Sequence, residues 1–332
     1  MKAGEDGPLE RASNCISDHS AGSLKIGVGE MDKRTVLFIA LAAAAFAGCI
    51  GEDRGPGEEE VRERMAEAVG DLGSYRFEIE MDQKVEFYNF DRRGSLEGER
   101  VSLRWTGEIN LTDLSSKEVS VSRRTDLAGE RAAEDEIEVY ILNGTLYQKM
   151  GEEWIGLFQP DPARGIEKID QIAHLLEMID RSDIAIEGAE RREGLDQYRL
   201  KVTPDDDTAY GIMLGQISSV NPRLPLMIDM LGLFAEGSKL EWTVWISGDT
   251  FLPTESRITT VYTAGPEVLR VPPDSPEDLQ IRFETLEVRR FLGYHEPVVV
   301  VLPEEARGAP VLRPEIPVEE EEEEEEEAFP GG

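Results

Sequence analysis

The sequence predicts a mostly β, α+β fold in which helices cover the apolar face of an antiparallel sheet. Stretches that alternate apolar and polar residues recur along the 332-residue chain, and turn signals separate them. Consecutive strands joined by short turns pair antiparallel. Two longer segments have helical spacing, and a sheet with one apolar face needs such segments to cover it.

The first elements expected are a helix and a strand. Val61, Met65 and Leu72 fall at helical spacing, and Gly73 is a plausible stop. From Tyr75 to Met81 every odd residue is apolar and every even residue is charged, which is typical of a strand with one wet face. Further strands are expected around residues 101–105, 119–121, 137–141, 198–202, 240–246, 256–262 and 281–288.

Two helical insertions are expected to interrupt the sheet. Residues 164–181 carry isoleucines and leucines on one face of a single amphipathic helix. Residues 209–234 are apolar nearly all round, so both sides need cover, and Pro222 and Pro225 break the segment into two pieces. This second segment is too short and too interrupted to span a membrane.

Residues 31–49 read as a secretory signal with a basic head, a short apolar run and small residues before Cys49. The end of this segment, Phe46-Ala-Gly-Cys49, resembles the lipobox of prokaryotic lipoproteins, although an aliphatic residue is usual at the position of Phe46. The resemblance implies that Cys49 is lipidated and anchors the chain in the cell envelope, on the outer face of the cytoplasmic membrane. The alternatives are a non-cleaved anchor or an ordinary signal peptide.

The expected organisation follows from this signal. Residues 1–30 precede it and are interpreted as a start-site overcall without ordered structure, and residues 31–48 are the signal peptide. Residues 49–60 form a flexible tether, residues 61–310 the folded body, and residues 311–332 an acidic disordered tail. The two cysteines are Cys15 and Cys49, so the body has no thiol for a disulfide, a metal or a nucleophile.

The chain is strongly acidic, with 35 Lys+Arg against 69 Asp+Glu and a net charge of −34. This charge argues against nucleic acid as a partner, because phosphate binding needs the opposite sign. The simplest interpretation is solubility. The unbroken glutamate run at 319–327 is expected to be a solvated tail, with loose cation binding or docking to a basic envelope protein as the alternative.

No catalytic or metal-binding motif stands out, so no enzyme activity, cofactor or metal is expected. His174 and His295 are isolated from each other in the sequence and are expected to be satisfied or solvent-facing. The aspartates at 205–207 lack the alternating oxygen ligands of a calcium loop and are interpreted as a polar turn.

Several segments, taken in order, resemble the LolA-like lipoproteins, especially the LppX/LprG type. After the lipobox and the first helix come SYRFEIEM, LNGTLYQKMGEEWIGL, IAIEGAERREGLDQYRLKVTPD, LEWTVWISGDTFLPTESRIT and RFLGYHEPVVVVLPEEA. The resemblance covers about residues 49–306 and implies a curved antiparallel half-barrel with helices on its concave side. It also implies that acyl chains of a lipid or lipoprotein bind between sheet and helices. The longer acidic tail and the Pro-split helix depart from the family.

A groove between sheet and helices is therefore the candidate site. If the helices pack tightly, the result is a plain core, and if they stand off, an apolar groove of several hundred Å³ remains. The two outcomes correspond to a lipid carrier and to an envelope interaction module with a filled core and no cargo. Methionine suits surfaces that accept varied apolar partners. The candidate groove residues are Phe77, Ile79, Met81, Leu103, Trp105, Met213, Met227, Met230, Trp242 and Val244.

Two sequons, at Asn110 and Asn143, lie at expected strand ends or turns. Both fit an exported domain if the host glycosylates its proteins, and chance sequons of this kind are common.

Overall fold

The computed structural model describes residues 55–89, 98–127, 129, 132–220, 238–269 and 278–313. From Pro56 onward these residues belong to one compact unit. Cys49, Met227, Met230 and the glutamate run lie outside the described residues, as do the two prolines that were expected to break the second helical segment.

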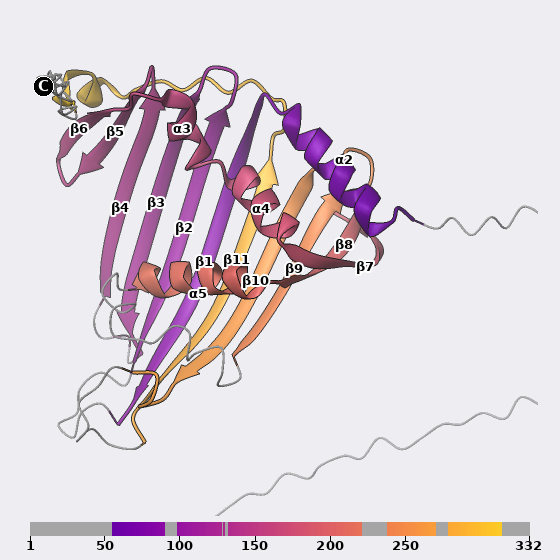
Figure 1. Ribbon diagram of the computed structural model, residues 1–332. Helices are drawn as coiled ribbons and strands as arrows, with labels where there is room; N and C mark the ends of the chain where they lie inside the picture. Colours follow the sequence, from indigo (N-terminus) through magenta and orange to yellow (C-terminus); the bar gives the residue numbers. More distant parts are fainter. Residues whose placement is uncertain are drawn as a thin grey trace, which may run out of the picture. The chain divides into compact units, whose positions relative to one another are not determined.

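A single sheet dominates the described part of the chain (Figure 1). Its spatial order is β12-β6-β5-β4-β3-β2-β1-β11-β10-β9-β8-β7, and it does not close into a barrel. Neighbours pair antiparallel except at one edge, where the two-residue β12 runs parallel to β6. The expected mostly β, open antiparallel architecture is confirmed, with this parallel edge as an addition. The strands are β1 (Ser74–Tyr88), β2 (Gly98–Asn110), β3 (Ser115–Asp126), β4 (Ala132–Leu142), β5 (Thr145–Met150), β6 (Glu153–Phe158), β7 (Ser182–Arg192), β8 (Leu195–Pro204), β9 (Lys239–Ser247), β10 (Pro253–Ala264), β11 (Gln280–Leu292) and β12 (Val311–Leu312).

The sheet is a meander except at its centre, where β1 pairs with the distant β11 as well as with its neighbour β2. The β1–β11 register runs from Arg76 opposite Leu292 to Tyr88 opposite Gln280. On β1 the odd-numbered residues from Tyr75 to Val85 are buried and most even-numbered ones are more exposed, as the alternation predicts.

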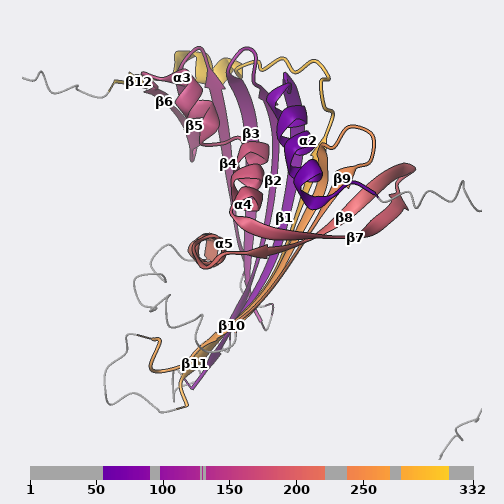
Figure 2. The same ribbon diagram turned by 45° about the vertical axis from the view of Figure 1, so that its right-hand side comes forward.

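Four helices of the described residues cross one face of this sheet, here called the helix side (Figures 1 and 2). The opposite surface is called the open face. None of these helices combines the length and the apolar character that crossing a bilayer requires. The expectation that helices cover the apolar face is confirmed. The helices are α2 (Glu58–Gly70), α3 (Pro162–Glu167), α4 (Gln171–Asp180) and α5 (Asp206–Val220).

The expectation of one helix over residues 164–181 is wrong, because the chain breaks into α3 and α4 there. Asp170 is the physical reason. Its carboxylate accepts hydrogen bonds from the backbone N–H groups of Ile172 and Ala173 and thereby starts a new helix. Asp161 caps α3 in the same way through the N–H of Arg164.

On β3 the apolar residues face away from the helices, which is the reverse of the usual arrangement. The expected apolar residues Val119 and Val121 lie on the open face, because Trp105 of β2 pairs with Ser120 and Gly107 pairs with Glu118. The helix side of β3 is therefore a line of polar residues. The alternation identified the strand correctly, but it contains no information on which of two mixed faces is covered.

Two hydrophobic clusters fill the helix side. The larger one lies under α2 and α4 and includes Tyr75, Phe77 and Ile172, all at most 2% exposed. The smaller one includes Met213 and Tyr262 and involves α5. Four polar side chains link α5 to the sheet: Gln83 donates to Thr285 and to the carbonyl of Gln216, and Thr260 donates to Gln216.

The first helix is fixed to the fourth by an arginine. Arg62 of α2 donates hydrogen bonds to the carbonyl oxygens of Ile179 and Ser182, at the end of α4 and the start of β7. Unsatisfied carbonyls at a helix end attract such donors.

Candidate functional site

A hollow of about 260 Å³ lies between the sheet and the helices α4 and α5. Its sheet-side wall consists of Ile79 and Met81 from β1 and Leu103 and Trp105 from β2. These four positions face the same side because Ile79 pairs with Trp105 and Met81 with Leu103 across adjacent strands. Trp105 is held by an edge contact with Phe77, at 5.4 Å between ring centroids.

The helix side of the hollow has small residues where packed helices usually carry large ones. Gly211 and Gly215 of α5 both line it, together with Ile212 and with Met178 of α4. A Cβ atom placed on either glycine would meet no atom within 4 Å. Glycine inside a helix costs roughly 0.5–1 kcal/mol relative to alanine, and no contact among the described residues requires it at these two positions. The two exposed glycines leave this border of the hollow open.

One edge of the hollow is polar. Glu287 and Arg289 of β11 line it and form an ion pair, with 2.5 Å between Arg289 Nε and Glu287 Oε1. Their side chains are only 9% and 17% exposed, so both charges are largely withdrawn from water. A buried pair of this kind is costly to break, because the remaining partner becomes an uncompensated buried charge.

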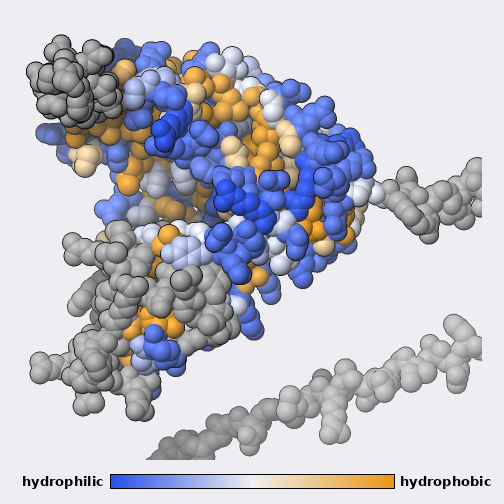
Figure 3. Space-filling view, in the orientation of Figure 1, coloured by the Kyte–Doolittle hydropathy of each residue, from blue (hydrophilic) through white to orange (hydrophobic). Residues whose placement is uncertain are grey.

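A second hollow of about 350 Å³ adjoins the first and lies between α4 and the beginning of α5. The two share Gln171, Met178, Ile212 and Arg289 among their lining residues, so the inner hollow has a route to the surface. Figure 3 shows hydrophobic and hydrophilic residues side by side on this face. The outer hollow is lined further by the polar residues His174, Glu177, Arg181, Asp207 and Thr208.

The structure brings four of the candidate groove residues together and places the others elsewhere. Ile79, Met81, Leu103 and Trp105 line the inner hollow. Phe77, Trp242 and Val244 are at most 2% exposed within the larger packed cluster, where they serve as ordinary core. Met213 belongs to the smaller cluster. Met227, Met230 and the anchor candidate Cys49 lie outside the described residues, so these remain predictions.

Sequence reasoning missed the polar edge and the glycines. On β11 the residues Ile281, Phe283 and Phe291 alternate toward the helix side, and Glu287 and Arg289 occupy two positions of the same series. Two charges on the apolar phase of a strand are an available signal for a polar spot in a groove. The glycines are one helical turn apart within an apolar segment, which is a second available signal.

Glu118 is a buried carboxyl beside the wall. Burial raises its pKa to about 7, and a hydrogen bond with the Trp105 side chain partly offsets this. Its Oε1 atom has no hydrogen-bond partner within the described part of the chain. Since Trp105 lines the hollow, the ionisation state of Glu118 is coupled to a wall residue.

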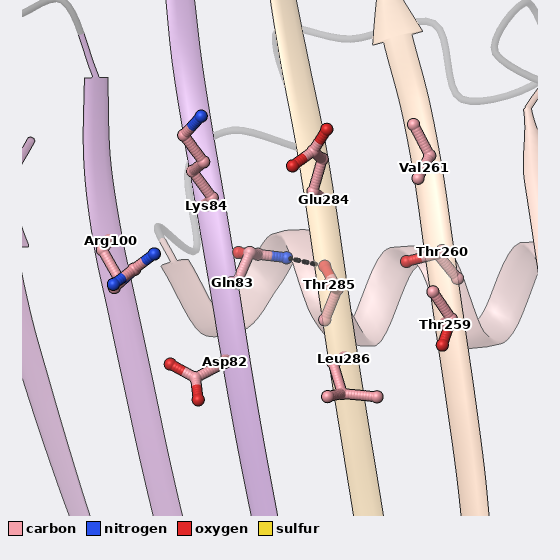
Figure 4. Close-up of a pocket in the computed structure, with 10 residues that line it drawn as sticks. All are labelled: Asp82, Gln83, Lys84, Arg100, Thr259, Thr260, Val261, Glu284, Thr285 and Leu286. Carbon is pink, nitrogen blue, oxygen red and sulfur yellow. Dashed lines mark hydrogen bonds between the residues drawn. The ribbon is translucent and has the colours of Figure 1, made fainter. Parts of the chain in front are cut away.

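The opposite, open face of the sheet also carries a hollow, of about 560 Å³ (Figure 4). Most of its lining is polar or charged, and it includes Asp82, Lys84, Arg100 and Glu284. Charged side chains border this hollow, whereas four apolar side chains form one wall of the inner hollow, and buried apolar area is what drives the binding of apolar chains. The inner hollow on the helix side is therefore the better candidate site.

The isolated histidines and the aspartate run belong to local structure of the fold. His174 Nε2 lies 3.0 Å from the carbonyl oxygen of Lys168, and His295 lies in a turn after β11 with φ of 57°. Asp205 caps α5 by accepting from the N–H of Thr208. Among the residues the structure describes, no group of three or more potential ligands could hold a metal ion.

The two sequons differ in their surroundings. Asn110 uses both ends of its amide, because its oxygen accepts from the N–H of Thr112 and its nitrogen donates to the carbonyl of Val298. Asn143 is exposed in the β4–β5 turn and has φ of 52° before Gly144. Glycosylation of Asn110 would remove a hydrogen bond of the fold, so Asn143 is the better acceptor on structural grounds.

No family model and no curated protein matches the chain. Among solved structures, it is similar to lipoprotein LppX of Mycobacterium tuberculosis, with 12% identity over 74% of this chain and 100% of that chain and a TM-score of 0.32. LprF of Mycobacterium bovis has 13% identity over 75% and 99% of the two chains and a TM-score of 0.30.

A Pseudomonas aeruginosa MucA/MucB complex is also similar, with 15% identity, coverage of 69% of this chain and 56% of that chain, and a TM-score of 0.23. LppX is among the proteins that the ordered motifs resemble. The likeness is one of fold alone, and at TM-scores of this size it carries no information on what the chain binds.

Proposed function

We propose that the protein is a non-catalytic lipoprotein of the cell envelope that holds acyl chains in the inner hollow. Cys49 would anchor it to the outer face of the cytoplasmic membrane, and the lipid or acylated ligand would be its cargo. One observation carries the proposal: an apolar wall of four residues and two helical glycines border the same open hollow. Burial contributes about 0.8 kcal/mol for each CH₂ group, so even a short length of chain would bind without a catalytic group.

Native mass spectrometry tests the proposal most directly. The full chain with Cys49→Ser carries no lipid anchor, so any lipid found after purification from an envelope and organic extraction is cargo. A near-stoichiometric lipid supports the carrier. A clean mass without lipid, unchanged after incubation with membrane lipids, would contradict it.

A cavity-filling variant ties the binding to this hollow. Gly215→Leu adds a side chain where a Cβ meets no atom, so it should occupy the hollow without disturbing the core. We expect at least a tenfold loss of acyl-chain affinity, with unchanged circular dichroism. Gly70→Leu is the matched control, because it also adds leucine to a helical glycine with open space, but on α2. Equal affinity in both variants would place the cargo elsewhere.

The alternative is an envelope interaction module, and one observation favours it. Five apolar side chains at the β5–β6–β12 edge are 38–60% exposed, and large exposed apolar patches mark interaction sites. The same mass spectrometry separates the two, because this module would carry a protein partner and no lipid. The patch consists of Met150, Leu157, Phe158, Val311 and Leu312.

A further inference from the structure

Most of the charged side chains that line the two hollows form ion pairs with one another. Arg289 is paired with Glu287 at 2.5 Å, and Arg181 is paired with Glu177 at 2.6 Å. Asp207, in the first turn of α5, is a fifth charge in the lining and is negative. The lining of the two hollows thus holds three carboxylates and two guanidinium groups, with no surplus of positive charge.

The buried pair keeps hydrogen-bond donors available although its net charge is zero. The contact with Glu287 uses Nε of Arg289, and within the described residues the two terminal nitrogens of that guanidinium have no other acceptor. A guanidinium has five N–H donors and Glu287 is an acceptor with two oxygens. Gln171 and Gln216 add amide groups to the same lining.

An anionic head group and an uncharged one would meet this edge differently. A phosphate or carboxylate would compete with Glu287 for Arg289, and displacing Glu287 would leave a buried carboxylate without its partner. An ester carbonyl could accept from the free nitrogens, and a hydroxyl could donate to Glu287, while the ion pair stays intact. The acidic surroundings of the mouth add repulsion against an incoming anion.

We propose that the polar end of the cargo is an uncharged hydrogen-bonding group, such as the ester and hydroxyl groups of a neutral glycerolipid, held at Glu287 and Arg289. This inference rests on the proposed function and names the class of ligand for the same site. The acyl chain lies against Ile79, Met81, Leu103 and Trp105, and the ion pair discriminates against anionic amphiphiles.

Competition among lipids with one acyl chain in common tests the proposal. Full-length chain with Cys49→Ser is loaded with the neutral dye Nile red at pH 8, and the dye is displaced by monooleoylglycerol, oleate or oleoyl lysophosphatidate below their micellar concentrations. We expect monooleoylglycerol to displace the dye at concentrations at least tenfold lower than either anion. An anion that competes equally well or better would overturn the inference and leave the carrier function standing. Failure of all three to compete would overturn both.

Glu287→Gln is the decisive variant, because it frees Arg289 for an anion. We expect the preference for the neutral lipid to fall at least tenfold. Glu284→Gln is the matched control: Glu284 pairs with Arg282 on the same strand, also at 2.5 Å, but on the open face. An unchanged preference in Glu287→Gln, or an equal change in both, would contradict the assignment.

A second variant keeps the test independent of the stability of the buried pair. Asp207→Asn removes a carboxylate from the exposed mouth, and its side chain makes no core contact that folding requires. We expect a two- to threefold gain for oleate and none for monooleoylglycerol. Equal effects on the two lipids would show that the mouth does not select by charge, against the proposal.

Discussion

The helix side has two regions, an upper one under α4 and a lower one under α5. Both regions use β1 and β2, but they pack in opposite ways. In the upper part, Tyr75 and Phe77 of β1 lie under Ile172 and Leu175 of α4, and all four are at most 2% exposed. In the lower part, the next residues of the same alternation on β1 border a hollow under α5. The strand residues are equally apolar in both regions. The covering helix therefore decides whether a strand face becomes core or groove.

The upper region is also fixed by polar contacts. The Tyr75 hydroxyl donates to Asp170 at 2.7 Å, and the same carboxylate caps α4. Burial, and then the nearby Asp170 carboxylate, raise the pKa of Tyr75, so its hydroxyl remains a donor. In the lower region Gln83 and Thr260 also bond α5, through Gln216, but two glycines of α5 border the hollow beside these contacts. This contrast can be tested residue by residue.

The largest expected effect comes from truncating matched side chains in the two regions. Ile172→Ala should destabilise the fold by about 3–4 kcal/mol, because Ile172 is fully buried and its neighbours cannot collapse into the space. Leu103→Ala should cost only about 1 kcal/mol, since Leu103 already borders open space. Urea unfolding measures both, and equal losses would show that the hollow is packed in solution.

The next effect is a pH dependence at the boundary between the regions. The folded-state pKa of Glu118 is about 7 against an ordinary value of 4.5, so the fold favours its protonated form. This contribution is fully present below about pH 4.5 and is lost as the pH rises through 7. The difference amounts to about 3 kcal/mol.

Glu118→Gln should remove this dependence. The stability of the variant relative to the parent should therefore increase between pH 4.5 and 8, as followed by urea unfolding at each pH. A flat profile for Glu118→Gln would mean that its carboxyl is solvated.

A third comparison concerns glycine in the two regions. A Cβ atom at Gly107 would lie 2.3 Å from the ring of Phe77, its cross-strand partner in the upper region. Gly107→Ala should therefore destabilise the fold by about 2 kcal/mol through overpacking. Thermal unfolding is the measurement, and tolerance of alanine there would show that the Phe77 ring can move at little cost.

The smallest effect has the opposite sign. Gly215→Ala should stabilise the fold by up to about 1 kcal/mol, because alanine favours a helix and its Cβ meets no atom in the hollow. Alanine should also reduce acyl-chain affinity much less than Gly215→Leu does. A destabilised Gly215→Ala would indicate that α5 closes onto the sheet in solution.

Much of the fold can be predicted from the sequence, because a strand with one solvent-exposed face has alternating apolar and polar residues. The alternating segment 75–81 shows this, and it lies within β1, which runs from Ser74 to Tyr88. The break before Asp170 was not foreseen, because the apolar spacing continues through it while the Asp170 carboxylate caps the start of a new helix. The face that β3 presents to the helices depends on register, which short-range pattern does not encode.

The site was predictable only in part. Its apolar wall on β1 and β2 follows from alternation, whereas Trp242 and Val244 have the same pattern and are plain core. Pattern alone cannot distinguish these cases, since the difference lies in which helix residue stands opposite. Gly211 and Gly215 indicate where the hollow lies, but only once the position of α5 over the sheet is known.

The pairing of β1 with β11 has a consequence for how the chain is made. Thirteen residue pairs join strands that are about two hundred positions apart in the sequence. A ribosome or an export channel delivers β1 long before its partner, so one edge of β1 stays open until residue 292 has emerged. Contacts of such long range slow folding, and an open strand edge invites pairing with other chains. The seam at the centre of the sheet is thus expected to be the last part to close, and a chaperone would protect it best by covering the early strand.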